Sequence, residues 1–260
     1  MIKNSITVVT ICYNNLDELI DTCKSVDKQT RTPDEHLIIN GSNTPFITNY
    51  MKNNSHPSYR RWIDLPNVHI SGSFNYGIEN AKSEIINLLN SGDEYFGEEA
   101  IETAFNEFKN DPSLMWTHGK YVQFRGGTWV STGKKLDPSL IYRGMMTIGH
   151  PTMFVKKEVY NRHGLFDTEK RIAMDYDLVI RIIKEKFRFI DYPFVKFYPG
   201  GVSSTKQAEG MEEVRDSYHK YRGKSIKQDL WITRSNLLNK FTNTGIGKFF
   251  FQLKNRKNKL

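Results

Sequence analysis

Residues 6–15, I-T-V-V-T-I-C-Y-N-N, set the architecture of the chain. The first seven are mostly β-branched and almost continuously apolar, as in a parallel strand that is buried on both faces. Asn14 and Asn15 end this run. Apolar side chains then recur at positions 16, 19, 20, 23 and 26, which is the spacing of a helix. The opening of the chain therefore predicts a buried strand followed by a helix.

The alternation continues downstream. A second apolar run, E-H-L-I-I at residues 35–39, ends at the turn pair N-G. Residues 76–82 are expected to form a helix, and residues 84–89, E-I-I-N-L-L, a third strand. Strands that alternate with helices predict an α/β fold with a parallel sheet.

Ligands bind such sheets at the carboxyl ends of the strands. Residues 10–14, 40–44 and 90–94 are therefore expected to converge in space. The rest of the chain is expected to contain helices at 98–109 and 177–186, aromatic strands at 115–118 and 121–124, and a polar, helical segment from about residue 206 onward.

The composition is that of a soluble globular protein. Of 260 residues, 38% are hydrophobic and 25% are charged, which excludes a disordered chain. The two cysteines, Cys12 and Cys23, form no disulfide framework, and Cys12 is expected to be a small core residue. The start of the chain lacks the pattern of a secretion signal, and no window approaches 18 uninterrupted apolar residues. We therefore expect a cytoplasmic protein.

The net charge of +8 is unevenly distributed. Residues 1–205 carry 24 basic and 24 acidic side chains, whereas residues 206–260 carry 13 basic and 5 acidic ones. Residues 247–257, G-K-F-F-F-Q-L-K-N-R-K, place three phenylalanines beside cations. This composition suits a segment lying on an anionic bilayer and equally suits a solvated terminus.

Three polar clusters are candidates for chemistry. In N-S-G-D-E at residues 90–94, Asp93 could bind a divalent cation that bridges two phosphates, or the segment could be a plain acidic turn. Asp175 and Asp177 precede a predicted helix, where carboxylates also serve as caps. His150, before Pro151, could be a ligand, a phosphate contact or a turn residue. Neither G-x-G-x-x-G nor a Walker sequence occurs, so dehydrogenase and P-loop readings lack support.

Taken in order, several pieces of residues 5–205 resemble family 2 of the GT-A glycosyltransferases. The pieces are T-V-V-T-I-C-Y-N-N, E-H-L-I-I-N-G-S-N-T, F-N-Y-G-I-E-N-A-K-S-E-I-I-N-L-L-N-S-G-D, G-H-P-T-M-F-V-K-K-E-V-Y with G-L-F-D and I-A-M-D-Y-D-L-V-I-R, and F-Y-P-G-G-V-S-S. The resemblance implies a Rossmann-like α/β fold with a mixed, mainly parallel central sheet and a helical C-terminal extension. It divides the chain into a nucleotide-sugar-binding half (1–97), an acceptor-binding half (98–205) and a basic extension (206–260).

The resemblance also implies roles for individual residues. Asp175 would be the catalytic base, and Asp93 would hold Mn²⁺ or Mg²⁺ on the donor diphosphate. The implied nucleotide-binding residues are Thr10, Cys12, Tyr13, Asn40, Gly41, Ser42, Asn75, Ser91 and Gly92. Further contacts to acceptor or diphosphate would come from His150, Glu94, Asp177 and Arg181.

Three positions depart from the family pattern. Asn40 replaces the aspartate that usually contacts the nucleobase, Gly92 replaces the first acid of the metal motif, and Met174 replaces the glutamate beside the base. The remaining parts suit direct inversion, because one carboxylate removes the acceptor proton while a cation offsets charge on the leaving diphosphate.

The resemblance implies an inverting hexosyltransferase with a UDP-linked donor, best matched by UDP-glucose and a β-linkage. The implied acceptor is a sugar on a polyprenyl diphosphate, as in O-antigen, lipopolysaccharide or capsule synthesis. The enzyme would lie on the inner face of the cell membrane, attached through residues 245–260. Two other readings are a sugar-nucleotide-binding protein without activity and a nucleic-acid module built on the basic tail. The neutral body of residues 1–205 argues against nucleic acid.

Overall fold

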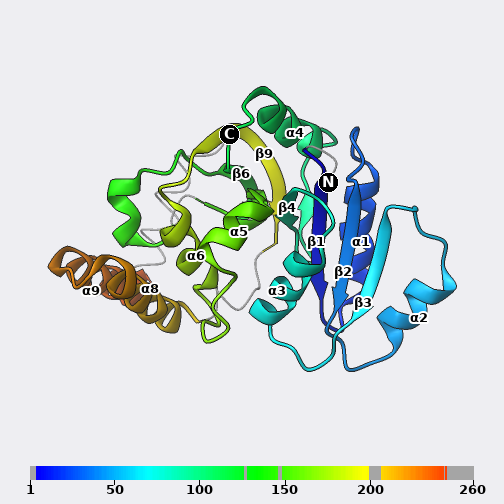
Figure 1. The fold of residues 1–260 in the computed structure, drawn as a ribbon. Coiled ribbons are helices and arrows are strands. Elements are labelled where there is room, and N and C mark those ends of the chain that lie inside the picture. Colours follow the sequence, from blue (N-terminus) through cyan, green and yellow to red (C-terminus); the bar gives the residue numbers. More distant parts are fainter. Residues whose placement is uncertain (1–3, 126–127, 146–147, 199–205, 243, 245–260) are drawn as a thin grey trace.

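The computed structural model describes residues 4–125, 128–145, 148–198, 206–242 and 244 (Figure 1). Within them lies one mixed sheet of nine strands, flanked by helices. The strands are β1 (Ile6–Cys12), β2 (Glu35–Asn40), β3 (Arg60–Asp64), β4 (Ile85–Leu88), β5 (Glu94–Tyr95), β6 (Trp116–Arg125), β7 (Thr128–Thr132), β8 (Phe154–Lys156) and β9 (Phe187–Phe197).

The helices alternate with these strands through the first half and gather at the end of the chain. They are α1 (Leu16–Asp27), α2 (Phe46–Asn53), α3 (Ile70–Asn80), α4 (Ala100–Asn110), α5 (Lys157–His163), α6 (Met174–Ile182), α8 (Gln207–Arg222) and α9 (Ile226–Thr242), with the short 3-10 turns η1 (Pro138–Arg143) and η2 (His150–Thr152).

The first half is a parallel sheet in the order β3-β2-β1-β4, which confirms the predicted α/β alternation. Both faces of β1 are buried because alternate side chains enter different cores. Val9 packs on the α3 side with Phe74, whereas Val8 packs on the opposite side with Val26 of α1. This double burial explains the uninterrupted apolar run at the start of the chain.

The three predicted ligand-side segments converge at the carboxyl edge of this sheet. The Gly41 amide donates to the carbonyl of Cys12 at 2.9 Å, and the Ser91 amide donates to the carbonyl of Ile11 at 3.0 Å. The Asn14 amide donates to Ser42 Oγ at 2.9 Å. This prediction is confirmed.

The second half continues the same sheet with reversed strands. β8 pairs antiparallel with β4 and with β6, and β9 runs parallel to β6 before pairing antiparallel with β5. α5 and α6 share a core with α3, and α4 packs on the opposite side of the sheet. The sheet is therefore mixed and continuous through both halves.

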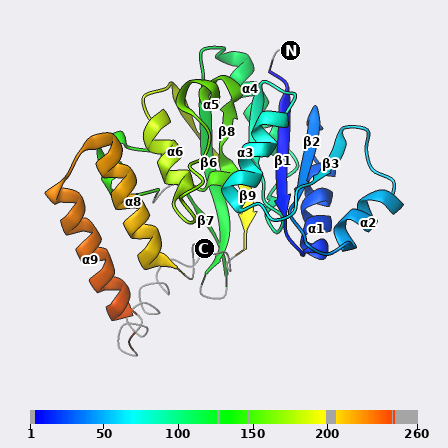
Figure 2. The same cartoon turned by 60° about the horizontal axis from the view of Figure 1, so that its bottom comes forward.

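The last two described helices form an outer layer. α8 packs against α6, and α9 packs against α8 and η1. Figure 2 shows α9 at the edge of the molecule, with α8 between it and α6. Among the described helices, none combines the length and apolar character needed to cross a membrane. The predicted membrane segment at 245–260 lies outside the described residues.

Two helix boundaries differ from the prediction. α3 occupies residues 70–80 rather than 76–82, because Ser71, Ser73 and Phe74 are buried and tertiary packing outweighs the weak helix propensity of S-G-S. α6 begins at Met174 and ends at Ile182, rather than running from 177 to 186. Asp175 therefore lies in the first turn of a helix, not before it.

Candidate active site

A cavity of about 620 Å³ opens at the carboxyl edge of β1, β2 and β4. It is lined by the loops that end these strands and by the start of α3: Ile11, Cys12, Tyr13, Asn15, Gly41, Asn67, Val68, His69, Ile70, Ser73, Asn90 and Ser91. Four residues predicted to bind the nucleotide, at positions 12, 13, 41 and 91, are among them. We call this space the donor cavity.

Other predicted nucleotide-binding residues support the donor cavity without lining it. Thr10 is fully buried, and its hydroxyl lies 3.0 Å from His36 Nε2. Burial and the Arg60 guanidinium hold the pKa of His36 well below its ordinary value, and its Nδ1 accepts from Arg60 Nε at 3.0 Å. The neutral imidazole therefore donates from Nε2 to Thr10, and Thr10 lies behind the lining of the donor cavity.

Asn75 and Asn40 also make internal contacts. The Asn75 amide donates to the carbonyl of Phe166 and accepts from its amide, both at 2.9 Å, so it joins α3 to a distant loop. Asn75 is not among the residues that line the donor cavity. Asn40 is buried, donates to Asp64 Oδ1 at 2.8 Å and accepts from the Ser42 amide at 3.1 Å. It holds the ends of β2 and β3 together beside the donor cavity.

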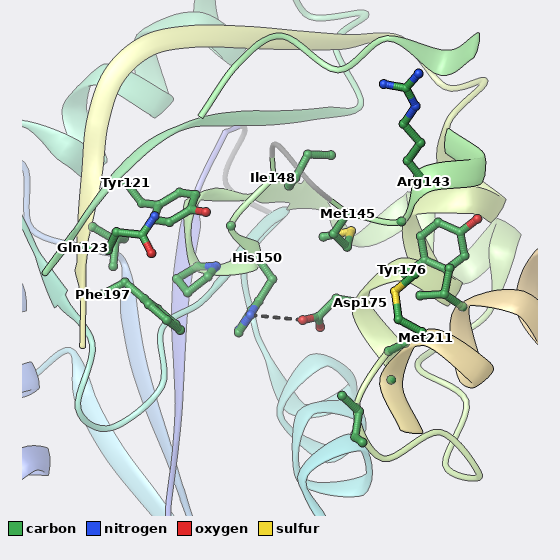
Figure 3. A pocket seen from close by; sticks show the side chains of 18 residues that line it. Tyr121, Gln123, Arg143, Met145, Ile148, His150, Asp175, Tyr176, Phe197 and Met211 are labelled. Carbon is green, nitrogen blue, oxygen red and sulfur yellow. Dashed lines mark ion pairs between the residues drawn. The ribbon is translucent and has the colours of Figure 1, made fainter. Parts of the chain in front are cut away.

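A second cavity, of about 500 Å³, lies between β6, β9, η1, α6 and α8 (Figure 3). Much of its wall is apolar, including Met145, Ile148, Ile172, Phe197, Met211 and Val214. Its polar groups include Tyr121, Gln123, Arg143, His150 and Asp175. We call it the acceptor-side cavity.

His150 and Asp175 meet at the wall of this second cavity (Figure 3). His150 Nδ1 lies 3.3 Å from Asp175 Oδ2. The other side-chain atoms of the pair, His150 Nε2 and Asp175 Oδ1, are buried and have no hydrogen-bond partner among the described residues. Unsatisfied buried polar atoms are costly, so these two atoms are candidates for contact with a polar ligand.

Asp93 belongs to the same cluster. Burial raises the pKa of Asp93 to about 7, an effect that nearby His150 partly opposes. Burial works against protonation of His150, but Asp175 and Asp93 together raise its pKa above the ordinary value. The two acids therefore act on one imidazole, although their segments are far apart in the sequence.

Local structure fixes these groups. The Asp93 amide donates to the carbonyl of Asn90 at 3.0 Å, and the Asp93 carbonyl accepts from Thr22 Oγ1 at 2.8 Å. Gly92 has φ +98°, and a Cβ there would lie 3.5 Å from Glu18 Oε2. The tight turn that presents Asp93 therefore needs a glycine.

The turn that carries His150 is fastened to the sheet. The Asn87 amide on β4 donates to the carbonyls of Pro151 at 2.9 Å and Met153 at 2.8 Å, and Tyr95 Oη donates to Asn87 Oδ1. The ring of Phe74 packs edge-on against the imidazole. A buried polar group on the strand leading to Asp93 thus also sets the position of His150.

Three predicted contacts to acceptor or diphosphate have structural partners instead. Asp177 is fully buried, receives a hydrogen bond from Ser217 Oγ at 2.9 Å and pairs with Arg181 Nε at 3.0 Å. Arg181 also donates to the carbonyls of His163, Gly164 and Leu165. Neither Asp177 nor Arg181 lines the donor cavity or the acceptor-side cavity. Glu94 accepts from Tyr198 Oη at 2.9 Å, on β5.

Comparison with known proteins identifies the family of this chain. The model of the family described as Glycosyl transferase family 2 matches residues 7–164. The chain belongs to this family. Two curated relatives of this glycosyltransferase are the uncharacterized glycosyltransferases MT1564 and Rv1514c of Mycobacterium tuberculosis strains CDC 1551 / Oshkosh and H37Rv. Each is 26% identical over 185 residues, covering 68% of this chain and 68% of the relative.

Solved structures share the GT-A fold of this family 2 chain. S. aureus TarS 1–349 in complex with UDP superimposes with a TM-score of 0.63 at 15% identity, covering 93% of this chain and 72% of that one. The same protein with UDP-GlcNAc gives 0.63 at 13%, covering 94% and 75%. Mannosyltransferase PcManGT from Pyrobaculum calidifontis, in complex with GDP-Man and Mn²⁺, gives 0.61 at 14%, covering 86% and 66%.

A cation held by Asp93 would have to be shared with a bound diphosphate. Among the described residues, no group of three or more His, Cys, Asp and Glu side chains could hold a metal ion alone. Mg²⁺ is often held by one or two carboxylates together with substrate phosphates and water. Asp93 supplies one such carboxylate, and its raised pKa shows that the isolated charge lacks compensation there.

Some lining residues of the glycosyltransferase were not predicted. Asn67 to Ile70 line the donor cavity. The turn residues L-P-N, which follow the strand R-R-W-I-D that the sequence analysis left unassigned, could have predicted a loop at this edge of the sheet. Met211 and Val214 of α8 line the acceptor-side cavity. Their sequence context is an ordinary amphipathic helix, and only tertiary packing places them beside Asp175.

Proposed function

We propose that this family 2 glycosyltransferase inverts the anomeric centre of a UDP-linked hexose as it transfers the sugar to an acceptor hydroxyl. The observation that carries the proposal is the meeting of Asp175 with His150 at the acceptor-side cavity, beside buried Asp93. Residues 1–97 would bind the donor and residues 98–205 the acceptor.

Asp175 is the proposed base. It lines the acceptor-side cavity, and one of its oxygens has no hydrogen-bond partner among the described residues. The carboxylate side chain is 24% exposed, and its exposed part can accept the proton of an acceptor hydroxyl as that hydroxyl oxygen attacks the anomeric carbon. His150 holds the other carboxylate oxygen and fixes the direction in which the base points. A positioned base contributes about 10²–10⁴-fold to the rate.

Asp93 would hold Mn²⁺ or Mg²⁺ against the donor diphosphate, where the cation offsets the charge that develops on the leaving group. Tyr13 and Gly41 line the donor cavity, where the exposed Tyr13 ring can stack on the nucleobase. The complexes of TarS with UDP and UDP-GlcNAc support a UDP-linked donor. Glucose with a β-linkage stays our specific choice.

The acceptor-side cavity is suited to an acceptor with an apolar face. Its apolar wall can contact a methyl, acetamido or lipid-proximal group, while Tyr121, Gln123 and Arg143 offer polar contacts. This supports a polyprenyl-diphosphate-linked sugar as the acceptor, in surface polysaccharide synthesis on the inner face of the cell membrane.

The test measures nucleotide release from a panel of UDP-sugars and GDP-mannose, with Mn²⁺ and a lipid-diphosphate sugar. We expect acceptor-dependent UDP release that EDTA stops and Mn²⁺ restores. Asp175→Asn should lose at least about 100-fold in rate while still binding UDP. Asp191→Asn, at an exposed carboxylate paired with Lys120, is the matched control and should retain activity.

A non-catalytic sugar-nucleotide-binding protein is the second candidate, because Gly92 replaces one acid of the metal motif. It predicts UDP-sugar binding without release of UDP under every condition tested. Equal signals from wild type and Asp175→Asn would favour it.

A further inference from the structure

An exposed apolar stripe runs along the outer side of α9. Among the described residues, this helix carries five exposed large apolar side chains: Ile226, Leu230, Leu237, Leu238 and Phe241. A helix turns by about 100° per residue, so positions 226, 230, 237 and 241 lie within about 60° of one another. Ile226 is 79% exposed, Leu230 66% and Leu237 63%. These four residues form what we call the α9 stripe.

The inner side of α9 packs against the rest of the protein. Gln228 and Ile232 are fully buried, and Trp231 packs edge-on against Tyr142 of η1. The stripe lies on the other side and is not needed to hold the helix in place. Figures 1 and 2 both show α9 as the outermost helix at its end of the molecule.

Cations border the stripe on one side. Lys227 and Arg234 are spaced by seven residues and are exposed. Lys227 Nζ lies 4.6 Å from the Tyr142 ring centroid, and the Arg234 guanidinium lies 5.4 Å from that of Trp231, so both cations rest on anchored rings. The one acid of this helix, Asp229, pairs with Arg215 at 3.3 Å. The border of the stripe is therefore positively charged.

We propose that α9 lies flat on an anionic lipid bilayer, with the α9 stripe in the acyl–headgroup boundary and the cations on lipid phosphates. A helix with one apolar side and a basic border has this preference. A second copy of the chain fits less well. One helix edge offers only a few hundred Å² of apolar surface, against about 800 Å² per partner in a stable dimer, and a symmetric contact would bring like charges together.

This surface consists of other residues than the basic tail at 245–260. It also has a consequence for the acceptor, which rests on the proposed function. α9 packs on η1 and α8, and these elements supply Arg143, Met211 and Val214 to the acceptor-side cavity. A bilayer against α9 would bring that cavity close to membrane-held acceptors.

The test is co-sedimentation of the full chain with phosphatidylcholine vesicles, with and without phosphatidylglycerol, in the absence of sugar substrates. We expect binding to the anionic vesicles. The double variant Leu230→Asp/Leu237→Asp should weaken it by at least about tenfold, since two apolar contacts become charged. Lys227→Glu/Arg234→Glu should weaken it and reduce its dependence on salt.

Phe46→Asp is the matched control. Phe46 is 67% exposed on α2, at the opposite end of the molecule, and this variant should bind vesicles as the wild type does. Circular dichroism melting would confirm that each variant is folded.

Three results would overturn the proposal. The first is wild-type vesicle binding by the folded Leu230→Asp/Leu237→Asp variant. The second is binding that depends only on residues 245–260. The third is a dimer that the double variant dissolves, without vesicle binding by the wild type. Because no sugar donor is present, none of these results bears on UDP release, so failure here is distinct from failure of the transferase proposal.

Discussion

At the scale of single residues, burial of the Asp93 carboxylate carries an electrostatic cost that a bound cation would relieve. Its carboxyl group is buried, and burial raises its pKa from 3.8 to about 7. Between pH 3.8 and about pH 7, the Asp93 carboxyl group is protonated in the folded chain and ionised in the unfolded chain. The free energy of unfolding therefore falls as pH rises through this window, and the full cost is present above pH 7.

The first prediction concerns the metal-free protein. Asp93→Asn should raise the free energy of unfolding at pH 8 by about 2–4 kcal/mol, because the variant buries no charge. At pH 4 the two proteins should be nearly equally stable. Urea unfolding in EDTA at both pH values measures this, with Asp191→Asn as the control that keeps the wild-type pH dependence. An equal difference at both pH values would contradict the assigned pKa.

The neighbouring residues Asp175 and Asp177 show that a sequence motif alone cannot assign a role to each of its residues. Both belong to the motif M-D-Y-D, and both were expected at the site. Asp175 lines the acceptor-side cavity, whereas Asp177 points to Arg181 and Ser217. The partner Ser217 lies 40 residues further along. The motif predicted the acids, but only packing of α8 on α6 separates their roles.

The second prediction follows from this difference. Asp177→Ala should lower the free energy of unfolding by about 3–5 kcal/mol, because it leaves the Arg181 charge without its buried partner. Asp175→Asn should change stability far less and abolish transfer instead. Urea unfolding and UDP release on both variants separate the two roles. A stable but inactive Asp177→Ala variant would indicate instead that Asp177 takes part in the reaction.

At the scale of elements, α8 prepares the start of α6. The Glu213 carboxylate on α8 accepts hydrogen bonds from the amides of Arg171, Ile172 and Ala173, at 3.0, 2.9 and 2.7 Å. Burial works against the charge of Glu213, but these amides and Lys170 lower its pKa overall. An acid from another helix thus holds the turn that leads into the helix carrying Asp175.

The third prediction concerns the contact between Glu213 and this turn. Glu213→Gln should raise the acceptor KM or lower kcat severalfold while leaving the donor KM unchanged, because the turn that positions Asp175 loosens. The contribution of Glu213 is present above its unfolded pKa and is lost as pH falls through the lower folded value. Wild type and variant should therefore converge in stability at low pH. Glu212→Gln, on the exposed side of α8, is the control.

The central elements were predictable because their own residues decide them. β1, β2 and β4 are apolar on both faces, and any other placement would expose them. The first turns of α3 and α6 were missed because tertiary packing, rather than local helix propensity, places these residues in helices. β9 was missed because F-R-F-I-D-Y-P-F-V-K-F mixes charges and a proline with aromatic residues. It is a strand because β6 and β5 pair with it.

At the scale of the whole molecule, the two cavities have separate walls: His150 and Asp175 line the acceptor-side cavity, whereas Asn90 and Ser91, just before Asp93 in the sequence, line the donor cavity. The donor cavity is built by the first half of the chain, whereas the acceptor-side cavity is built by the second half together with α8. Substitutions in the two walls should therefore act on different substrates.

The fourth prediction uses this division. Tyr13→Ala should raise the donor KM by about tenfold through loss of base stacking and leave the acceptor KM unchanged. Met211→Glu should do the reverse, because a charge replaces part of the apolar wall. Steady-state kinetics with each substrate varied in turn measures both. Equal effects of either variant on both constants would show that the cavities do not act separately.

The turn at Gly92 restricts which residues can occupy this position. Its backbone adopts φ +98°, and a side chain there would approach Glu18. An aspartate introduced at this position, which would recreate paired acids, would bear backbone strain and face a second negative charge. A second carboxylate at this turn would therefore destabilise it unless Glu18 on α1 also changed.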